Sequence, residues 1–274
     1  MNNEIIHSVR SIYGLDISKY DISFLKRAVE KRCSITETKN ISDYIQYLSS
    51  NSDEATILFQ SLNIIHTEFF RNPLTFAHLE QWILPRLMEE KSDNNELRIW
   101  SAGCSSGQEV YSIAMLIESI TSKKQIKKRY RIIATDISES ALHAAKKGEY
   151  NEKDIQMIRV KDLNDFFVKS GEKYKVCDRL KQHVSFSTYD LLDNRSACPQ
   201  ESIFGNFDLV VCSNMLFYYK PNYQHNMVKK LIDSMDEHGY LITGEAEMQI
   251  VAKFKDLFLV VPPSPIFKKR RGAK

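Results

Sequence analysis

The residues best placed to bind a ligand follow a short apolar run that is typical of a β-strand. Leu97-Arg-Ile-Trp-Ser101 leads into Ala102 and Gly103, and Gly107 follows after three further residues. Glycines in a turn between a strand and a helix let the backbone approach a ligand closely. A tight turn without any ligand uses the same residues, so this segment by itself leaves both interpretations open.

The spacing within this turn disfavours a dinucleotide. A dinucleotide site uses the pattern G-x-G-x-x-G, which seats a pyrophosphate at the start of the following helix. Here Ser105 stands two residues after Gly103, no third glycine follows Gly107, and no lysine stands nearby to hold a phosphate. A ligand without phosphates fits better, and S-adenosylmethionine is one such ligand.

Three acidic residues could contact this ligand. Asp136 ends a second strand-like run, where an acid commonly accepts hydrogen bonds from both ribose hydroxyls. It could also cap the helix expected from Ser138, and both roles can coexist. Asp190 follows the third run and could touch an adenine edge or be an ordinary loop residue. Glu109 opens a helix, where the helix dipole favours an acid, or it contacts the cofactor.

Strands that alternate with helices must position these residues. Helical stretches at 109–121 and 138–147 separate the first strands, which predicts parallel pairing and a doubly wound sheet. Ligands bind such sheets at the carboxyl ends of the strands. The stretch 258–267 is strand-rich and interrupted by prolines, so we expect an antiparallel hairpin at the sheet edge. The predicted strands are Leu97–Ser101, Arg131–Thr135, His183–Phe186, Phe207–Cys212 and Tyr240–Thr243.

Composition narrows the class of protein. The formal net charge is only +3, so we expect no nucleic-acid partner. The five cysteines include no C-x-x-C pair, which gives no sign of a metal site and fits a reducing cytosol. No apolar run approaches the ~20 residues that cross a bilayer, and the first residues do not resemble a signal peptide. We therefore expect a cytoplasmic protein without membrane insertion.

Taken together, the motifs resemble the chemotaxis receptor methyltransferases (CheR). The resemblance covers nearly the whole chain, including residues 1–78, where apolar residues recur at helical spacing. The Thr-x-Phe-Phe-Arg motif is specific to that family among methyltransferases. The motifs are Thr67-Glu-Phe-Phe-Arg71, Ile99–Gly107 with Glu109, Tyr111 and Ser112, Ala134-Thr-Asp136, Lys147-Gly-Glu-Tyr150, Phe207–Cys212 with Asn214 and Tyr218, and Gly239–Glu247.

The resemblance implies a fold and an activity. An N-terminal all-helical domain for substrate docking (1–78) would precede a Rossmann-like class I methyltransferase domain of the α/β class (79–274). A small antiparallel β-subdomain would be inserted in the latter at about 155–184. The family transfers a methyl group from S-adenosylmethionine to glutamate side chains of chemoreceptors, which leaves S-adenosylhomocysteine and needs no metal.

The resemblance also implies site residues. Arg71 and Tyr218 would lie closest to the transferring methyl group. The cofactor would contact Thr67, Arg71, Ala102, Gly103, Glu109, Asp136, Asp190, Leu191, Ser213 and Asn214. Two positions depart from the family pattern, because Ile65 replaces an asparagine and Ser213 replaces an arginine. Both changes remove polar contacts, which implies weaker cofactor binding or a divergent member.

The chemistry assigns roles to the two central residues. A glutamate has a pKa of about 4.3 and is ionised at neutral pH, so its methylation needs no general base. A tight arginine clamp on that carboxylate would stabilise the reactant more than the transition state. We therefore expect Arg71 to position the cofactor carboxylate or the substrate, and Tyr218 to orient through its hydroxyl.

Basic residues indicate how a receptor could dock. Lys26, Arg27, Lys31 and Arg32 lie on one predicted helix, and the family uses this helix for substrate contact. A solvated helix face is the alternative. Some members also bind a receptor-tail peptide at the edge of the β-subdomain. The hairpin expected around Ser170-Gly171 is a few residues shorter than theirs, so we expect no such tethering here.

Three other functions compete with this one. The chain could be a class I methyltransferase that acts on another substrate. It could be a non-catalytic relative that binds the cofactor in signalling, an alternative that Ile65 and Ser213 keep open. A nucleotide-dependent dehydrogenase is disfavoured, because the phosphate-binding pattern is missing.

Overall fold

The computed structural model describes residues 2–62, 67–91, 95–202, 205–270 and 272. Residue contacts divide the chain into two compact units. The helical unit comprises Met1–Ile64 and Phe217–His225, and the α/β unit comprises Ile65–Leu216 and Asn226–Lys274. This division falls at residue 64, whereas the sequence placed the boundary at residue 78.

Residues 67–90 join the α/β unit because their apolar side chains lie in its core. Phe69, Leu79 and Leu84 are buried in the same hydrophobic cluster as the central strands. Their spacing resembles that of the preceding helices. Helical periodicity therefore does not show which of two cores a helix joins.

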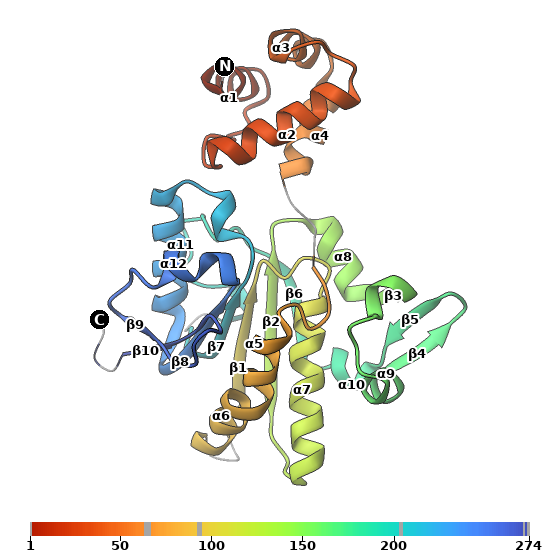
Figure 1. Ribbon diagram of the computed structural model, residues 1–274, viewed down its shortest axis with the longest axis vertical. Coiled ribbons are helices and arrows are strands. Elements are labelled where there is room, and N and C mark those ends of the chain that lie inside the picture. The colour runs from red at the N-terminus through yellow and green to blue at the C-terminus, as the bar shows by residue number, and fades with distance from the viewer. Residues whose placement is uncertain (1, 63–66, 92–94, 203–204, 271, 273–274) are drawn as a thin grey trace. The chain divides into compact units, whose positions relative to one another are not determined.

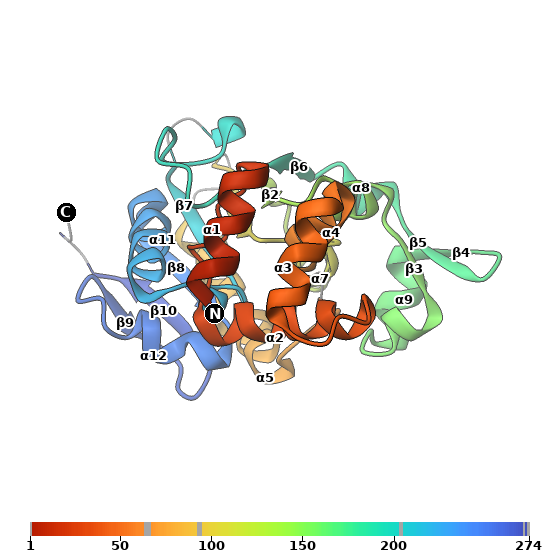
Figure 2. The same ribbon diagram turned by 90° about the horizontal axis from the view of Figure 1, so that it is seen from above.

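Four helices form most of the helical unit, and each packs against the other three (Figure 2). Asp21 begins the second helix by accepting hydrogen bonds from the N–H groups of Ser23 and Phe24. Asn40 begins the third by accepting one from Asp43. These caps fix the helix starts, because they satisfy N–H groups that have no partner within the helix. The helices are α1 (Asn2–Tyr13), α2 (Ile22–Ile35), α3 (Ile41–Ser50) and α4 (Ser52–Leu62).

A segment distant in the sequence, Phe217–His225, completes the helical unit. Tyr219 forms a backbone bridge with Tyr20, and their rings stack with centroids 5.2 Å apart. The ring of Tyr218 lies 4.7 Å from that of Phe24. The chain thus returns to this unit long after α4 has ended. The segment contains part of η4 (Leu216–Tyr218) and the start of α11 (Pro221–Ser234).

A seven-stranded sheet forms the centre of the α/β unit, in the order β6-β2-β1-β7-β8-β10-β9 (Figure 1). The first five strands in this order pair in parallel, and β10 pairs antiparallel with both neighbours. All six residues of β7 are buried, as expected for a central strand of a parallel sheet. The strands are β1 (Leu97–Ala102), β2 (Tyr130–Asp136), β6 (Val184–Thr188), β7 (Phe207–Cys212), β8 (Met235–Thr243), β9 (Leu257–Leu259) and β10 (Ile266–Lys269).

These pairings confirm the predicted fold class. Each of the five predicted strands is present and parallel, and the stretch 258–267 contributes to the antiparallel edge. The chain leaves β1 in one direction along the sheet to β2 and β6, and then returns to the other side of β1 with β7. This reversal lies between β1 and β7, which is where such sheets bind ligands.

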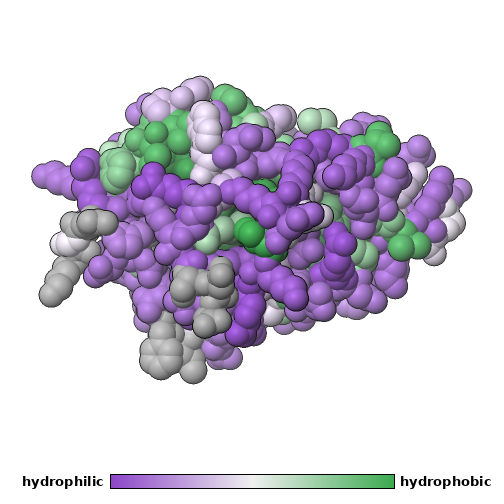
Figure 3. Space-filling model, turned by 90° about the horizontal axis from the view of Figure 1, so that it is seen from below, coloured by the Kyte–Doolittle hydropathy of each residue, from purple (hydrophilic) through white to green (hydrophobic). Residues whose placement is uncertain are grey.

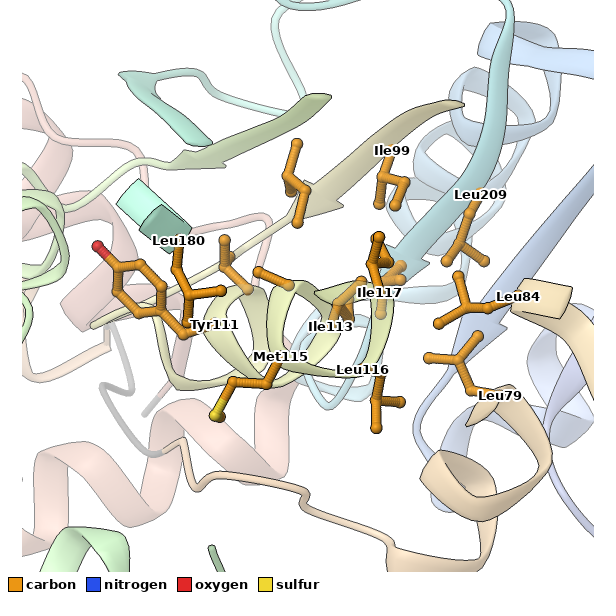
Figure 4. Close-up of a cluster of buried hydrophobic side chains, with 14 of the residues drawn as sticks. Leu79, Leu84, Ile99, Tyr111, Ile113, Met115, Leu116, Ile117, Leu180 and Leu209 are labelled. Carbon is orange, nitrogen blue, oxygen red and sulfur yellow. The ribbon is translucent and has the colours of Figure 1, made fainter. Parts of the chain in front are cut away.

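Helix α7 covers one face of the sheet within a large hydrophobic cluster (Figure 4). Ile113 and Ile117 of this helix lie with Ile99 of β1 and Leu209 of β7, and Leu84 packs beside them. The helices of this unit and its shorter turns are α5 (Pro73–His78), the π-helical turn η1 (Leu79–Ile83), α6 (Leu84–Glu90), α7 (Gln108–Lys124), α8 (Glu139–Lys147), η3 (Gln200–Ser202), η5 (Glu245–Glu247) and α12 (Met248–Val251).

A second, antiparallel sheet has three strands in the order β3-β5-β4. It extends outside the predicted range of 155–184. Tyr150 of β3 pairs with Tyr174 of β5 before that range begins, and Val184 at its end belongs to the large sheet. A strand of three residues shows no periodicity, so the sequence did not reveal it. The elements are β3 (Glu149–Asn151), η2 (Glu152–Ile155), α9 (Val160–Phe166), β4 (Phe167–Ser170), β5 (Lys173–Val176) and α10 (Asp178–Lys181).

The face of the molecule seen in Figure 3 is mainly hydrophilic and is broken by separate apolar patches. Exposed apolar side chains of the α/β unit include Leu74, Trp82 and Phe258. Within the described ranges, every helix is too short or too polar to cross a bilayer.

Candidate cofactor site

The glycine turn after β1 is bonded directly to the end of β2. The N–H groups of Gly103 and Cys104 donate to the carbonyl oxygen of Thr135 at 2.8 and 2.9 Å. The N–H of Ser105 donates to Oδ2 of Asp136 at 2.8 Å. Two predicted site residues, Gly103 and Asp136, therefore stand next to each other at the carboxyl ends of neighbouring strands.

The backbone at Gly103 favours glycine. Its φ is +79°, and an added Cβ would lie 2.6 Å from Sδ of Met215. A side chain here would be strained by the backbone conformation and would have to displace the side chain of Met215. Ala102, which precedes it on β1, is buried at 2% exposure.

Asp136 organises the turn on both sides of itself. Its Oδ1 accepts the N–H of Ser138 at 2.9 Å, while Ser138 itself caps α8 through the N–H of Ala141. The helix cap is thus the serine and not the aspartate. Each carboxylate oxygen has room for a second hydrogen bond, so Asp136 can also accept two ribose hydroxyls.

The loop after β6 brings Asp190 and Leu191 to the same edge. The N–H of Tyr189 donates to the carbonyl oxygen of Asp136 at 3.1 Å. Oδ1 of Asp190 accepts the N–H of Leu192 at 2.9 Å, and Leu191 is buried at 6% exposure. A polar acid and an apolar side chain therefore follow Asp136, an arrangement suited to the edge and face of a purine.

Glu109 is a buried acid of this site with a shifted pKa. Burial raises the pKa of Glu109 to about 7, and the negative charge of Glu247 raises it further. Hydrogen bonds from Ser101 and Ser213 lower this pKa, and so does the positive charge of Arg71. The Ser101 hydroxyl donates to Oε1 at 2.8 Å. The structure therefore brings Arg71, Glu109 and Ser213 within electrostatic reach of one another.

The Thr67–Arg71 motif is fixed by its two phenylalanines. Phe69 is fully buried, with its ring edge-on to those of Tyr150 and Phe167 at 4.8 and 5.7 Å. The N–H of Phe70 donates to Oγ of Ser112 in α7 at 3.0 Å.

The backbone on either side of Arg71 is strained. Phe70 and Asn72 have φ of +52° and +60°, a region that non-glycine residues rarely adopt. Such strain is concentrated at functional sites. Thr67 is half-buried at the start of the motif, whereas Ile65 lies outside the described residues.

Asn214 follows β7 with φ +62°. Its N–H donates to Oε2 of Glu247 at 2.8 Å, and the N–H of Leu216 donates to Oε1 at 2.6 Å. Sequence reasoning included Glu247 in a motif but gave it no role. In the sequence, Glu247 is simply an acid that follows an apolar strand. Its partners are backbone groups of another loop, and no sequence pattern reveals such partners.

Tyr218 belongs to the helical unit, where its ring packs on Phe24. Of the two predicted catalytic residues, only Arg71 belongs to the α/β unit. The structure therefore gathers the predicted cofactor contacts from residue 67 to residue 214 in one unit and places Tyr218 in the other.

The site has the features that a phosphate-free nucleoside needs. Among the described residues, Oγ of Ser105 is one of three buried side-chain oxygens without a hydrogen-bond partner. It lies in the same turn as Gly103, beside the acid Asp136. A buried hydroxyl without a partner indicates a place for a ligand or water, because burying it unpaired is costly. These residues fit S-adenosylmethionine.

The order of the strands, together with the polar site at their carboxyl ends, defines a class I S-adenosylmethionine-dependent methyltransferase. Residues 65–264 match the family model described as CheR methyltransferase, SAM binding domain. Residues 3–62 match the model described as CheR methyltransferase, all-alpha domain. The chain belongs to the CheR methyltransferase family.

Curated relatives agree with this assignment. A chemotaxis protein methyltransferase of Borreliella burgdorferi is 30% identical over 253 residues, which cover 89% of this chain and 87% of the relative. One of Listeria monocytogenes is 29% identical over 242 residues, covering 87% and 86%. A solved magnesium protoporphyrin IX methyltransferase from Synechocystis, with bound SAM, has 16% identity and a TM-score of 0.37 over 72% of this chain and 76% of that one. The assignment rests on the sequence family and not on this last likeness.

Proposed function

We propose that this protein transfers a methyl group from S-adenosylmethionine to glutamate side chains of chemoreceptors and forms glutamate methyl esters. The observation that carries the proposal is that one chain joins the SAM binding domain and the all-alpha domain of a single methyltransferase family. Relatives that match along most of both chains are named chemotaxis protein methyltransferases. The cofactor supplies a methyl group on a positively charged sulfur.

The cofactor contacts that we propose come from three strand ends. Asp136 would accept the ribose hydroxyls, and Asp190 with Leu191 would contact the adenine. Gly103, after Ala102, would let the backbone approach the ligand. The hydrogen bonds that already hold these segments together support this assignment, since they fix the segments at one edge of the sheet.

We assign Arg71, Glu109 and Thr67 to the amino-acid end of the cofactor, with Ser213 and Asn214 beside them. The opposite charges of Arg71 and Glu109 suit the carboxylate and ammonium groups of a methionine moiety. Ser213 replaces the family's arginine and instead donates a hydrogen bond to Glu109. This bond lowers the pKa of the acid and so favours its charged form.

The substrate carboxylate needs no general base, because a glutamate with a pKa of about 4.3 is already ionised at neutral pH. The protein's task is then to align the two reactants, which by itself lowers a barrier substantially. We assign Arg71 to positioning and Tyr218 to orientation through its hydroxyl.

Receptor docking would use the exposed basic face of α2. Arg27 and Lys31 are exposed one turn apart, whereas Arg32 forms an ion pair with Glu54 inside the helical unit. The basic patch is therefore smaller than the sequence indicated. Two adjacent cations still suit a receptor helix that carries several glutamates.

We still expect that the β-subdomain does not bind a receptor-tail peptide. β4 and β5 have four residues each, and the turn between them contains Gly171 with φ +62°. A binding experiment with the tail peptides of candidate receptors would decide the question.

Label transfer tests the proposed function. Purified receptor would be incubated with the enzyme and S-adenosylmethionine that carries a radioactive methyl group. We expect incorporation that mild base releases, because methyl esters hydrolyse readily. A base-stable label would indicate a different acceptor group. Binding of S-adenosylhomocysteine without transfer to any receptor would favour the non-catalytic alternative.

A further inference from the structure

Glu247 is a buried acid that binds backbone groups. Its exposed fraction is 0%. Oε2 accepts the N–H groups of Asn214 and Gly244 at 2.8 Å each, and Oε1 accepts that of Leu216 at 2.6 Å. The N–H of Met215 lies close enough to lower the pKa of this carboxyl. One carboxylate thus holds both the loop after β7 and the end of β8.

The loop held in this way has an unusual shape. Asn214 has φ +62°, and the N–H groups of residues 214 and 216 donate to the same carboxylate, with the N–H of residue 215 between them. Successive N–H groups that converge on one anion form a nest, a conformation that an anion stabilises. The same loop carries Met215, whose Sδ lies 2.6 Å from the position of a Cβ on Gly103.

We propose that Glu247 is the positioning residue of the cofactor site, because its carboxylate sets the backbone of Asn214 and of Met215, whose side chain lies beside the Gly103 turn. It acts through this loop and contacts no ligand itself. The inference rests on the proposed function, since it takes this edge of the sheet as the place where S-adenosylmethionine binds.

A second buried acid provides a matched control. Asp208 is 4% exposed at the opposite end of β7, and it likewise binds a backbone N–H, that of Arg98 at 2.8 Å. It also pairs with Lys91 at 2.5 Å. If Glu247 only stabilised the fold, its replacement would lower the melting temperature and leave cofactor binding nearly unchanged, as we expect for Asp208.

Two variants disturb the loop by different means. Glu247→Gln keeps the size of the side chain but replaces one acceptor oxygen by a donor, so at least one N–H loses its partner. Gly244→Ala leaves Glu247 intact and places a Cβ 2.6 Å from Nδ2 and 3.0 Å from the backbone nitrogen of Asn214. Gly244 has φ −73°, which alanine adopts readily, so the disturbance falls on Asn214.

Calorimetric binding of S-adenosylhomocysteine, thermal unfolding and amide hydrogen exchange form the test, with Asp208→Asn beside the two variants. We expect Glu247→Gln and Gly244→Ala to weaken binding by about tenfold or more. Asp208→Asn should lower the melting temperature and change the Kd by less than about twofold. Without ligand, the amides of Asn214 and Leu216 should exchange faster in Glu247→Gln.

Wild-type Kd values in both loop variants would overturn the inference, and so would an equal loss of binding in Asp208→Asn. Gly244→Ala decides the question if Glu247→Gln does not fold. Failure of the wild-type protein to bind S-adenosylhomocysteine would instead count against the proposed function. The exchange rates, which need no ligand, would then still show whether Glu247 orders the loop.

Discussion

Ser101 donates a hydrogen bond from Oγ to Oε1 of Glu109 at 2.8 Å, and so joins the end of β1 to the first turn of α7. This bond favours the charged acid, but burial outweighs it and raises the pKa of Glu109 to about 7. The folded protein therefore retains this proton at a pH at which an unfolded chain has released it.

The first prediction concerns pH. Between the unfolded pKa and the folded pKa of Glu109, unfolding releases a proton, so the stability of the folded state falls as pH rises. Relative to Glu109→Gln, the wild type should lose on the order of 2 kcal/mol of unfolding free energy from about pH 5 to about pH 8. Urea unfolding of the ligand-free proteins measures this difference. A difference that does not change with pH would contradict the shifted pKa.

The second prediction concerns Arg71. Arg71→Ala removes the cation next to Glu109 and should lower the methylation rate by at least about 100-fold, because the reactants lose their alignment. Label transfer to receptor measures the rate. Arg86→Ala is the control, since Arg86 is an exposed arginine of α6 that pairs only at the surface with Glu90. A near-normal transfer rate in Arg71→Ala would show that Arg71 does not position the reactants.

The third prediction separates rate from binding at Tyr218. Tyr218→Phe keeps the ring that packs on Phe24 and removes the hydroxyl. We expect kcat to fall about tenfold and the Kd for S-adenosylhomocysteine to change less than about threefold. Tyr219→Phe, which keeps the stacking on Tyr20, should leave both values near those of the wild type. Retention of the full rate in Tyr218→Phe is incompatible with its assigned role.

The fourth prediction tests docking on α2. Reversing the charges of Arg27 and Lys31 to glutamate should lower kcat/KM for receptor by about tenfold, because like charges would then face the acidic helix. The Kd for S-adenosylhomocysteine should not change. Arg10→Glu on α1, another exposed cation of the helical unit, is the control. If the control and the double variant lose equal activity, α2 has no special part in docking.

The fifth prediction concerns stability. Glu54 is buried and accepts hydrogen bonds from Arg32, with both atom pairs at 2.7 Å, and from the hydroxyl of Tyr44 at 2.7 Å. Glu54→Gln leaves the arginine without its counter-charge and should cost about 3 kcal/mol in urea unfolding. The exposed pair of Lys26 and Glu30 should contribute less than about 0.5 kcal/mol, so Glu30→Gln should be nearly neutral. Equal losses of unfolding free energy in the two variants would show that burial does not determine how much an ion pair stabilises this protein.

The sequence predicted the large sheet well, because its strands are apolar runs bounded by turns. It did not predict that Phe217–His225 packs with the helices, since this packing depends on Tyr20 and Phe24, about 200 residues away. The sequence likewise counted Arg32 among the basic residues of α2 that could dock a receptor. Its partner Glu54 stands on another helix, and only the fold brings the two together.

The candidate site was predictable where it depends on strand ends. Gly103, Asp136 and Asp190 each follow an apolar run, and parallel pairing brings such ends to one edge. The environment of Ser213 and the role of Glu247 were not predictable, because both depend on hydrogen bonds between segments that are far apart in the chain. The family motif identified Tyr218 but did not show which unit contains it.

The helical unit is built from two separate stretches of the chain, and this limits how it can be dissected. A truncation that begins after α4 would strip Tyr218 and Tyr219 of the aromatic partners that Phe24 and Tyr20 provide. The shortened protein would expose more of both tyrosine rings to water, which favours aggregation. Loss of activity in such a fragment could therefore result from the lost packing and not from lost docking. Single substitutions on the surface of α2 test docking without disturbing this packing.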